Sequence, residues 1–223
     1  MTRQTRPGGV SLDIWGTLLG SDPAFKPARN TLLRDAVAPD VPGDRFDAAM
    51  RQADRDVDDV CVRDGIDIGF GGRIEATLLA LDLPVDGVAG RLPELYAAQE
   101  ALALAHPPRP LHVELPAAVS ALPLPVVLTS NTGMLPGELM RKLLALAGFG
   151  AVPGVFSNEL GVAKPHPRMF EAACDLLVIP AADVLHVGDN PDADVAGAQA
   201  AGMTAVLVQP DGASTLAVLE QLS

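Results

Sequence analysis

Three carboxylates of this chain stand where strands and turns could bring them into one site. Asp13 follows the apolar residues of "SLDIW", at the end of a short apolar run. Asp189 and Asp194 flank the polar turn "NPDA". A carboxylate can act as a nucleophile or as a ligand for Mg²⁺, which binds through few carboxylates together with water and phosphate. The sequence therefore offers both a candidate nucleophile and a candidate metal site.

Two further polar segments could complement these carboxylates. Ser130 and Asn131 end the apolar run "LPVVLTSN" and precede a helical pattern, where a hydroxyl and backbone N–H groups attract anions. Lys164 lies directly before Pro165 and supplies a single positive charge. Together these side chains could bind an anionic group and balance the carboxylates.

The segments that must position these residues alternate between strand and helix patterns. Compact apolar runs predict strands, and apolar residues three and four positions apart predict helices. Such alternation is typical of a parallel sheet covered by helices, with ligands bound beyond the carboxyl ends of the strands. The predicted strands are 9–14, 124–131, 155–158, 183–190 and 204–209, and the predicted helices are 134–148, 167–177, 192–202 and 216–222.

A long stretch between the first two strands has a different character. From residue 25 to about 106 the pattern predicts helices only, separated by segments rich in glycine and proline. We interpret this stretch as an inserted unit of about four helices, and its charged run "RQADRDVDDVCVRD" as the solvated face of one of them. The expected helices are 26–38, 44–62, 72–83 and 91–105.

Charge and composition exclude several classes of partner. The formal net charge of −12 disfavours nucleic acid and anionic membranes, both of which reward clustered Lys and Arg. The apolar stretch near 117–128 is short and interrupted by prolines, and no apolar signal segment follows the polar start. Cys61 and Cys174 have no partner motif. We expect a cytoplasmic protein with a small-molecule substrate, without nucleic-acid or membrane partners, as a monomer or homodimer.

The order of the polar segments resembles the haloacid dehalogenase-like (HAD) superfamily. "DIWGT", "LTSN", "AKPHPRMF" and "VLHVGDNPDADVAGAQAAGM" are similar to its four motifs, and the helical insert lies where that family carries an alpha-helical C1 cap. The resemblance implies an α/β fold with a Rossmann-like three-layer core and a parallel sheet, plus an all-helical cap subdomain. The implied division is 1–22 and 110–223 for the core and 23–109 for the cap.

The resemblance also implies roles for individual residues. Asp13 would be the nucleophile that forms an aspartyl-phosphate, and the site would hold Mg²⁺ and a phosphorylated substrate. The implied metal ligands are Asp13, the backbone carbonyl of Trp15, Asp189 and, through water, Asp194. The implied catalytic and substrate-binding residues are Asp13, Trp15, Gly16, Thr17, Ser130, Asn131 and Lys164.

Trp15 departs from the pattern of most HAD phosphatases. They carry a second Asp there, which protonates the leaving group, and indole cannot replace it. A positioned acid is worth about 10²–10⁴-fold in rate, so we expect Mg²⁺-dependent hydrolysis of substrates whose leaving group needs no proton, or an acid supplied by the cap. Two alternatives are a 2-haloacid dehalogenase, since those relatives have an aromatic residue here, and a catalytically weak or inactive phosphate-binding protein.

Two histidines are weighed as additional functional groups. His166, two residues after Lys164, could donate a proton, but its place before Pro167 favours the start of a helix. His186 alternates with apolar residues within a predicted strand, which favours a place in the core.

Overall fold

A five-stranded parallel sheet forms the centre of the protein in the computed structural model, which describes residues 6–223. The strand order is β5-β4-β1-β6-β7, so β1 lies in the middle. The α/β fold with a parallel sheet, predicted above, is confirmed; the first five residues of the segment 1–22 lie outside the described part. The strands are β1 (Gly9–Leu12), β4 (Val126–Ser130), β5 (Gly154–Phe156), β6 (Val184–Gly188) and β7 (Thr204–Leu207).

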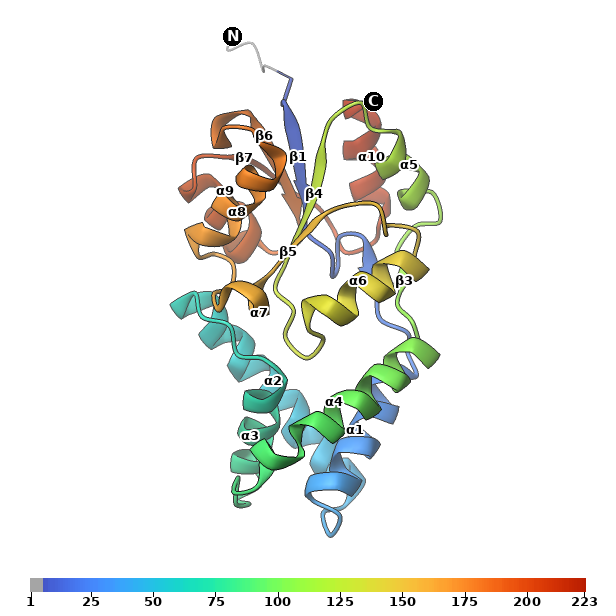
Figure 1. The fold of residues 1–223 in the computed structure, drawn as a ribbon, viewed down its shortest axis with the longest axis vertical. Helices are drawn as coiled ribbons and strands as arrows, with labels where there is room; N and C mark the ends of the chain where they lie inside the picture. The colour runs from blue at the N-terminus through green and yellow to red at the C-terminus, as the bar shows by residue number, and fades with distance from the viewer. Residues whose placement is uncertain (1–5) are drawn as a thin grey trace.

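Successive residues of each strand point to opposite faces of the sheet. Both faces carry apolar side chains, and helices cover both. Val10 and Leu12 of β1 face a cluster with α5 (Leu115–Ala121), α6 (Gly137–Leu146) and α10 (Ala213–Leu222). Residues of β4, β5 and β6 on the other side pack against α8 (Pro167–Leu177) and α9 (Gly197–Ala200). The result is the predicted three-layer core (Figure 1).

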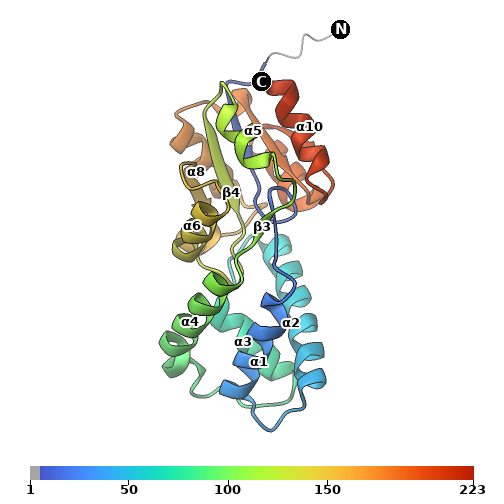
Figure 2. The same ribbon diagram turned by 90° about the vertical axis from the view of Figure 1, so that its right-hand side faces the viewer.

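Four helices form a separate lobe beyond one end of the sheet, which we call the helical unit (Figures 1 and 2). They bury a hydrophobic cluster of their own, centred on Phe46, Met50, Phe70 and Ile74. No helix of residues 6–223 is both long and apolar enough to span a bilayer. The helices are α1 (Phe25–Val37), α2 (Gly43–Asp64), α3 (Phe70–Ala80) and α4 (Val88–Ala105).

The chain enters and leaves the helical unit through two short paired strands. β2 (Leu19–Gly20) and β3 (Arg109–Pro110) are antiparallel neighbours. Two-residue strands show no alternation of apolar and polar residues, so the sequence did not predict them. On the far side, the loop between α2 and α3 touches the core, where the Ala163 amide donates to Gly65 O at 3.1 Å.

The helix predicted over 192–202 begins differently from expectation. Residues Pro191–Ala196 form a π-helical turn, and α-helical geometry starts only at α9. The Asn190 side chain accepts hydrogen bonds from the amides of Asp192 and Ala193 at 3.0 and 2.9 Å. This capping satisfies amides of the first turn, and the Asn190 amide donates to Asp194 Oδ2 at 3.0 Å, which positions that carboxylate.

The helical unit depends for its stability on its own hydrophobic cluster. Phe70 is 1% exposed and its ring lies 4.5 Å from that of Tyr96, centroid to centroid. We expect Phe70→Ala to lower the free energy of unfolding by about 3–5 kcal/mol, as for other buried aromatic residues. Leu79→Ala, on the same helix but 64% exposed, should change it by less than about 0.5 kcal/mol. Urea denaturation of both variants gives the comparison, and equal losses would contradict it.

Candidate active site

The carboxyl ends of the central strands bring the predicted polar segments together at one edge of the sheet. Asp13 follows β1, Asn131 follows β4, and Asp189 and Asp194 follow β6. Lys164 comes from the loop between α7 (Ser157–Leu160) and α8. These five residues line a cavity of about 730 Å³ between the sheet edge and the helical unit.

The Lys164 ammonium holds two of the carboxylates together. Its Nζ donates to Asp13 Oδ1 and to Asp194 Oδ1, each at 2.6 Å, and to the backbone oxygen of Thr129 at 2.7 Å. The Lys164 side chain is only 2% exposed. Burial alone would lower its pKa, but the charges of Asp13 and Asp194 raise it well above the ordinary value, so the ammonium keeps its charge.

The two carboxylates that share Lys164 differ in their protonation. Burial, opposed by Lys164 and reinforced by the charges of Asp194 and Asp189, raises the pKa of Asp13 to about 7. Burial also disfavours the charged form of Asp194, but Lys164 and His186 outweigh it and hold the pKa of that carboxyl well below its usual range. One lysine therefore does not keep both groups fully ionised at neutral pH.

The arrangement of the carboxylates fits a divalent cation. Oxygens of Asp13, Asp189 and Asp194 all lie within 4.8 Å of one another. Burial, with the charge of Asp194, raises the pKa of Asp189 as well. Mg²⁺ prefers oxygen ligands such as carboxylates. Lys164 alone does not balance the negative charge of three carboxylates, and a divalent cation would do so. The residues present therefore match the metal that the sequence resemblance implies.

Gly16 lies directly against this cluster. A Cβ at this position would be 2.2 Å from Asp189 Oδ2, and the φ of +80° is one that residues with side chains rarely adopt. The glycine thus allows the loop after β1 to pass beside the Asp189 carboxylate.

Asn131 ties the loop of Lys164 to the end of β4. Its side-chain oxygen accepts from the Lys164 amide at 2.7 Å, and its side-chain nitrogen donates to the Lys164 carbonyl at 3.0 Å. The side-chain amide of Asn131 thus positions the lysine, and the binding of the transferring group by an Asn131 amide stays a prediction.

The surroundings of three other residues are also defined, while their predicted contacts with substrate stay predictions. The Gly16 amide donates to Leu19 O at 3.0 Å, because the chain turns back towards β2 at this point. Thr17 is fully buried, and its hydroxyl has no hydrogen-bond partner among the described residues. Ser130 is also fully buried, with its hydroxyl 3.4 Å from Asn131 O, and Thr132 rather than Ser130 reaches the cavity wall.

Trp15 is half-buried between core and cavity. Its indole packs against the main hydrophobic cluster of the core and lines the cavity beside the carboxylates. Its backbone pairs with Leu19 in an isolated bridge. The side chain thus fills, with an apolar surface, a position close to the candidate nucleophile.

A buried polar group beneath the site was not assigned a role from the sequence. His186 Nε2 lies 3.1 Å from Asp194 Oδ1, and His186 Nδ1 lies 2.8 Å from the Ser11 hydroxyl. The Ser11 and Thr129 hydroxyls are 2.8 Å apart. Ser11 and His186 are paired residues of the neighbouring strands β1 and β6. A polar residue within each of these two apolar strands was the sequence feature that could have predicted this network.

His166 has the position expected from the proline that follows it. It is the N-cap of α8, and its side chain accepts a hydrogen bond from the Arg168 amide at 3.2 Å. Asp192 is exposed in the turn before α9.

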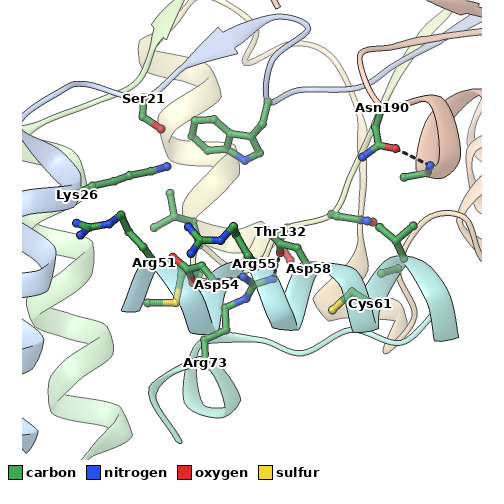
Figure 3. Close-up of a pocket in the computed structure, with 18 of the residues that line it drawn as sticks. Ser21, Lys26, Arg51, Asp54, Arg55, Asp58, Cys61, Arg73, Thr132 and Asn190 are labelled. Carbon is green, nitrogen blue, oxygen red and sulfur yellow. Dashed lines mark hydrogen bonds and ion pairs between the residues drawn. The ribbon is translucent and has the colours of Figure 1, made fainter. Parts of the chain in front are cut away.

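The opposite wall of the cavity comes from the helical unit. The run "RQADRDVDDVCVRD" of α2 was predicted to be a solvated face, and its exposed residues Arg51, Arg55 and Asp58 line the cavity (Figure 3). A surface facing a second lobe shows the same polar composition as one facing water, so sequence alone did not separate them. The charged residues on this wall are Lys26, Arg29, Asp47, Arg51, Asp54, Arg55, Asp58, Asp67 and Arg73.

The raised pKa of Asp13 predicts how pH affects metal-free protein. In the folded state the pKa of Asp13 is about 7, against an ordinary value of 3.8. Between these pH values the folded protein binds more protons than the unfolded chain, so its free energy of unfolding falls as the pH rises. We expect Asp13→Asn to gain stability relative to wild type between about pH 5 and about pH 8, on the order of 2 kcal/mol or roughly 4–8 °C in Tm.

Thermal unfolding with EDTA measures this difference. Asp192→Asn removes an exposed carboxylate from the neighbouring turn and serves as the matched control. A constant difference for Asp13→Asn across the same range would contradict the prediction.

Comparison with known proteins places this geometry in context. The family model described as HAD-hydrolase-like matches residues 161–221, a segment that includes Lys164, Asp189 and Asp194. Phosphoserine phosphatase from Thermus thermophilus is 40% identical over 75 residues, which cover 32% of this chain and 29% of that protein. The chain thus matches less than a third of that relative's length.

Solved structures extend the likeness to nearly the whole chain. The putative HAD-hydrolase YfnB from Bacillus subtilis, bound to magnesium, has a TM-score of 0.67 at 17% identity and covers 93% of this chain and 91% of its own. 2-Haloacid dehalogenase from Pseudomonas syringae pv. tomato has a TM-score of 0.60 at 23% identity, covering 91% and 86%. These identities show a shared fold. The family match covers residues 161–221 alone, and the solved structures show the same fold over nearly the whole chain.

Proposed function

We propose that the protein is a Mg²⁺-dependent phosphohydrolase in which Asp13 receives the phosphoryl group. The observation that carries the proposal is the position of Asp13: it lines the cavity, bound to Lys164 through one oxygen and close to two other carboxylates. Relatives named as phosphatases support phosphoryl chemistry. The substrate is a small phosphorylated molecule.

The carboxylate cluster is the proposed metal site. Asp13, Asp189 and the backbone carbonyl of Trp15 would hold Mg²⁺, which would supply positive charge for the phosphoryl oxygens and for an ionised Asp13. Asp194 has both oxygens engaged, one by Lys164 and His186 and the other by the Asn190 amide at 3.0 Å. Its proposed contribution is therefore indirect, through water and through Lys164.

The reaction proceeds in two steps at Asp13. In the first, a carboxylate oxygen of Asp13 bonds to phosphorus while the bond between phosphorus and the leaving oxygen breaks. In the second, water bonds to phosphorus and the aspartyl oxygen leaves, which releases inorganic phosphate and restores Asp13. Lys164 holds Asp13 Oδ1, and this contact leaves Oδ2 as the oxygen that attacks.

Trp15 limits the leaving groups that this site can expel. The indole N–H is a weak donor and accepts no proton, so it assists neither departure of an alkoxide nor activation of water. Acyl phosphates and other activated phosphates lose a leaving group that is stable without a proton. They are the proposed substrate class for the first step.

The helical unit is the proposed cap over this site, with the division 23–109 for the cap and 1–22 with 110–223 for the core. Its wall encloses the cavity opposite the carboxylates, and it contacts the core through the Ser157 hydroxyl and Asp67 at 2.5 Å. Closure of such a cap excludes water and strengthens electrostatic contacts within the site.

A second candidate, 2-haloacid dehalogenase, is favoured by one observation, the aromatic side chain of Trp15 beside the nucleophile. It would require Asp13 to attack carbon without a metal. The proximity of Asp189 opposes this function, because an additional carboxylate raises the pKa of Asp13 and weakens it as a nucleophile. The same cavity gives Asp13 access to ligands, which favours an enzyme over a binding protein.

Phosphate release from acetyl phosphate, p-nitrophenyl phosphate and glucose 6-phosphate tests the proposal. We expect release in the order acetyl phosphate, then p-nitrophenyl phosphate, then glucose 6-phosphate, with loss of activity in EDTA. Asp13→Asn should lower kcat by roughly 10³-fold or more, since the nucleophile is gone. If no phosphate is released from any of the three substrates, and chloride is released from 2-chloropropionate in the presence of EDTA, the result would contradict the proposal and support the dehalogenase.

Substitution of Trp15 tests the restriction on leaving groups. Trp15→Asp would place a general acid where the indole stands, and we expect kcat/KM for glucose 6-phosphate to rise by roughly 10²-fold. The gain for acetyl phosphate should be far smaller, because its leaving group needs no proton. Trp15→Phe keeps an aromatic side chain without an acid and is the matched control. A similar gain for both substrates, or a gain in the control, would argue against this role.

A further inference from the structure

Three cationic side chains face the carboxylates across the cavity. Lys26 comes from α1, and Arg51 and Arg55 come from α2. We call these three residues the cation wall. All are exposed to the cavity, and Figure 3 shows them on the helical side of it.

Two other arginines on the same wall are engaged within the helical unit. Arg29 and Arg73 are buried, and both contact Asp54, at 3.5 and 3.4 Å. Arg73 also pairs with Asp58 at 2.5 Å. These contacts join α1, α2 and α3, so Arg29 and Arg73 act in the packing of the helical unit.

The cation wall has no such neutralisation. Within residues 6–223, no carboxylate lies within ion-pair distance of Lys26, Arg51 or Arg55, and the side-chain contact of Arg55 is with Gln52 Oε1, at 2.6 Å. The acidic groups nearby already accept hydrogen bonds: Asp47 accepts from Asn30 at 2.9 Å, and Asp54 and Asp58 accept from the buried arginines.

Such a concentration of free positive charge is unexpected in this chain. The formal net charge is −12, with 28 acidic against 16 basic residues. Arg51 and Arg55 are also one helical turn apart, where like charges destabilise a helix. A bound anion would remove this repulsion, and the planar guanidinium group suits a carboxylate or phosphate.

From this geometry we infer that the cation wall binds a second anionic group of the substrate, at the end remote from the phosphoryl group. The substrate class is a small phosphorylated acid, a phosphate compound that carries a carboxylate or a second phosphate. This inference rests on the proposed function for the phosphoryl end. It adds a selectivity determinant, since a substrate with a neutral remote end leaves the cation wall unpaired.

Paired substrates with closely similar leaving groups test the selectivity. We expect wild type to prefer 3-carboxy-4-nitrophenyl phosphate over 4-nitrophenyl phosphate by about tenfold or more in kcat/KM. The Arg51→Gln/Arg55→Gln double variant should bring this ratio close to unity, and Lys26→Gln should lower it. Arg45→Gln removes an exposed cation from α2 outside the cavity and should keep the wild-type ratio. A wild-type ratio near unity, or the same ratio in the double variant, overturns the inference.

A binding measurement separates this inference from the proposed function. Calorimetry with Asp13→Asn protein and Mg²⁺ compares methylphosphonate with 3-phosphonopropionate and 1,2-ethylenediphosphonate, which add a carboxylate or a second phosphonate. We expect about tenfold tighter binding of at least one of the latter two, lost when the Arg51→Gln/Arg55→Gln changes are added. Equal binding of all three overturns the inference even if phosphate release is observed.

Tighter binding without any phosphate release supports the cation wall while refuting the hydrolase. The relative affinities of the carboxylate and phosphonate ligands then show which anion the wall prefers. Circular dichroism spectra and Tm values that match wild type show that the variants remain folded, so a lost preference is not explained by unfolding.

Discussion

One buried positive charge, the Lys164 ammonium, is the interaction on which the rest of the site depends. Its three hydrogen bonds join Asp13 of the first motif, Asp194 of the last and the backbone of β4. Removing one member of a buried ion pair strands the other charge in a medium of low dielectric, so the three segments are fixed relative to one another. Asn131 adds a second constraint by binding both backbone polar groups of the lysine.

The sheet beneath the site supports this ion pair with polar side chains of its own. Ser11, Thr129 and His186 form a hydrogen-bonded row across β4, β1 and β6, and the row ends on the same Asp194 oxygen that Lys164 holds. Buried polar groups are tolerated when each has a partner, and a satisfied network restricts its members to one geometry. The carboxylates therefore project from a rigid base, where a metal and a phosphoryl group would meet fixed ligands.

The two walls of the cavity have opposite character. The core wall carries three clustered carboxylates and one lysine, whereas the helical wall carries cations without carboxylate partners among the described residues. Trp15 lies between them as an apolar surface. A molecule spanning this space would meet the carboxylate cluster at one end and the cation wall at the other. The paired strands β2 and β3 carry the chain between the two walls.

The sequence by itself determined the alternation of strands and helices, the helical insert and the order of the polar segments, because these depend on local periodicity and on residues at strand ends. It predicted α8 over 167–177, and it placed Asp13, Lys164, Asp189 and Asp194 at one edge of a sheet. Only the tertiary structure decided what each polar atom contacts. Asn131 binds the Lys164 backbone, the Gly16 amide is taken by Leu19 and Ser130 lies beneath the surface, since hydrogen bonds between distant segments leave no local pattern. The side of α2 that faces the cavity was hidden for the same reason: a surface opposite another lobe and one opposite water have the same composition.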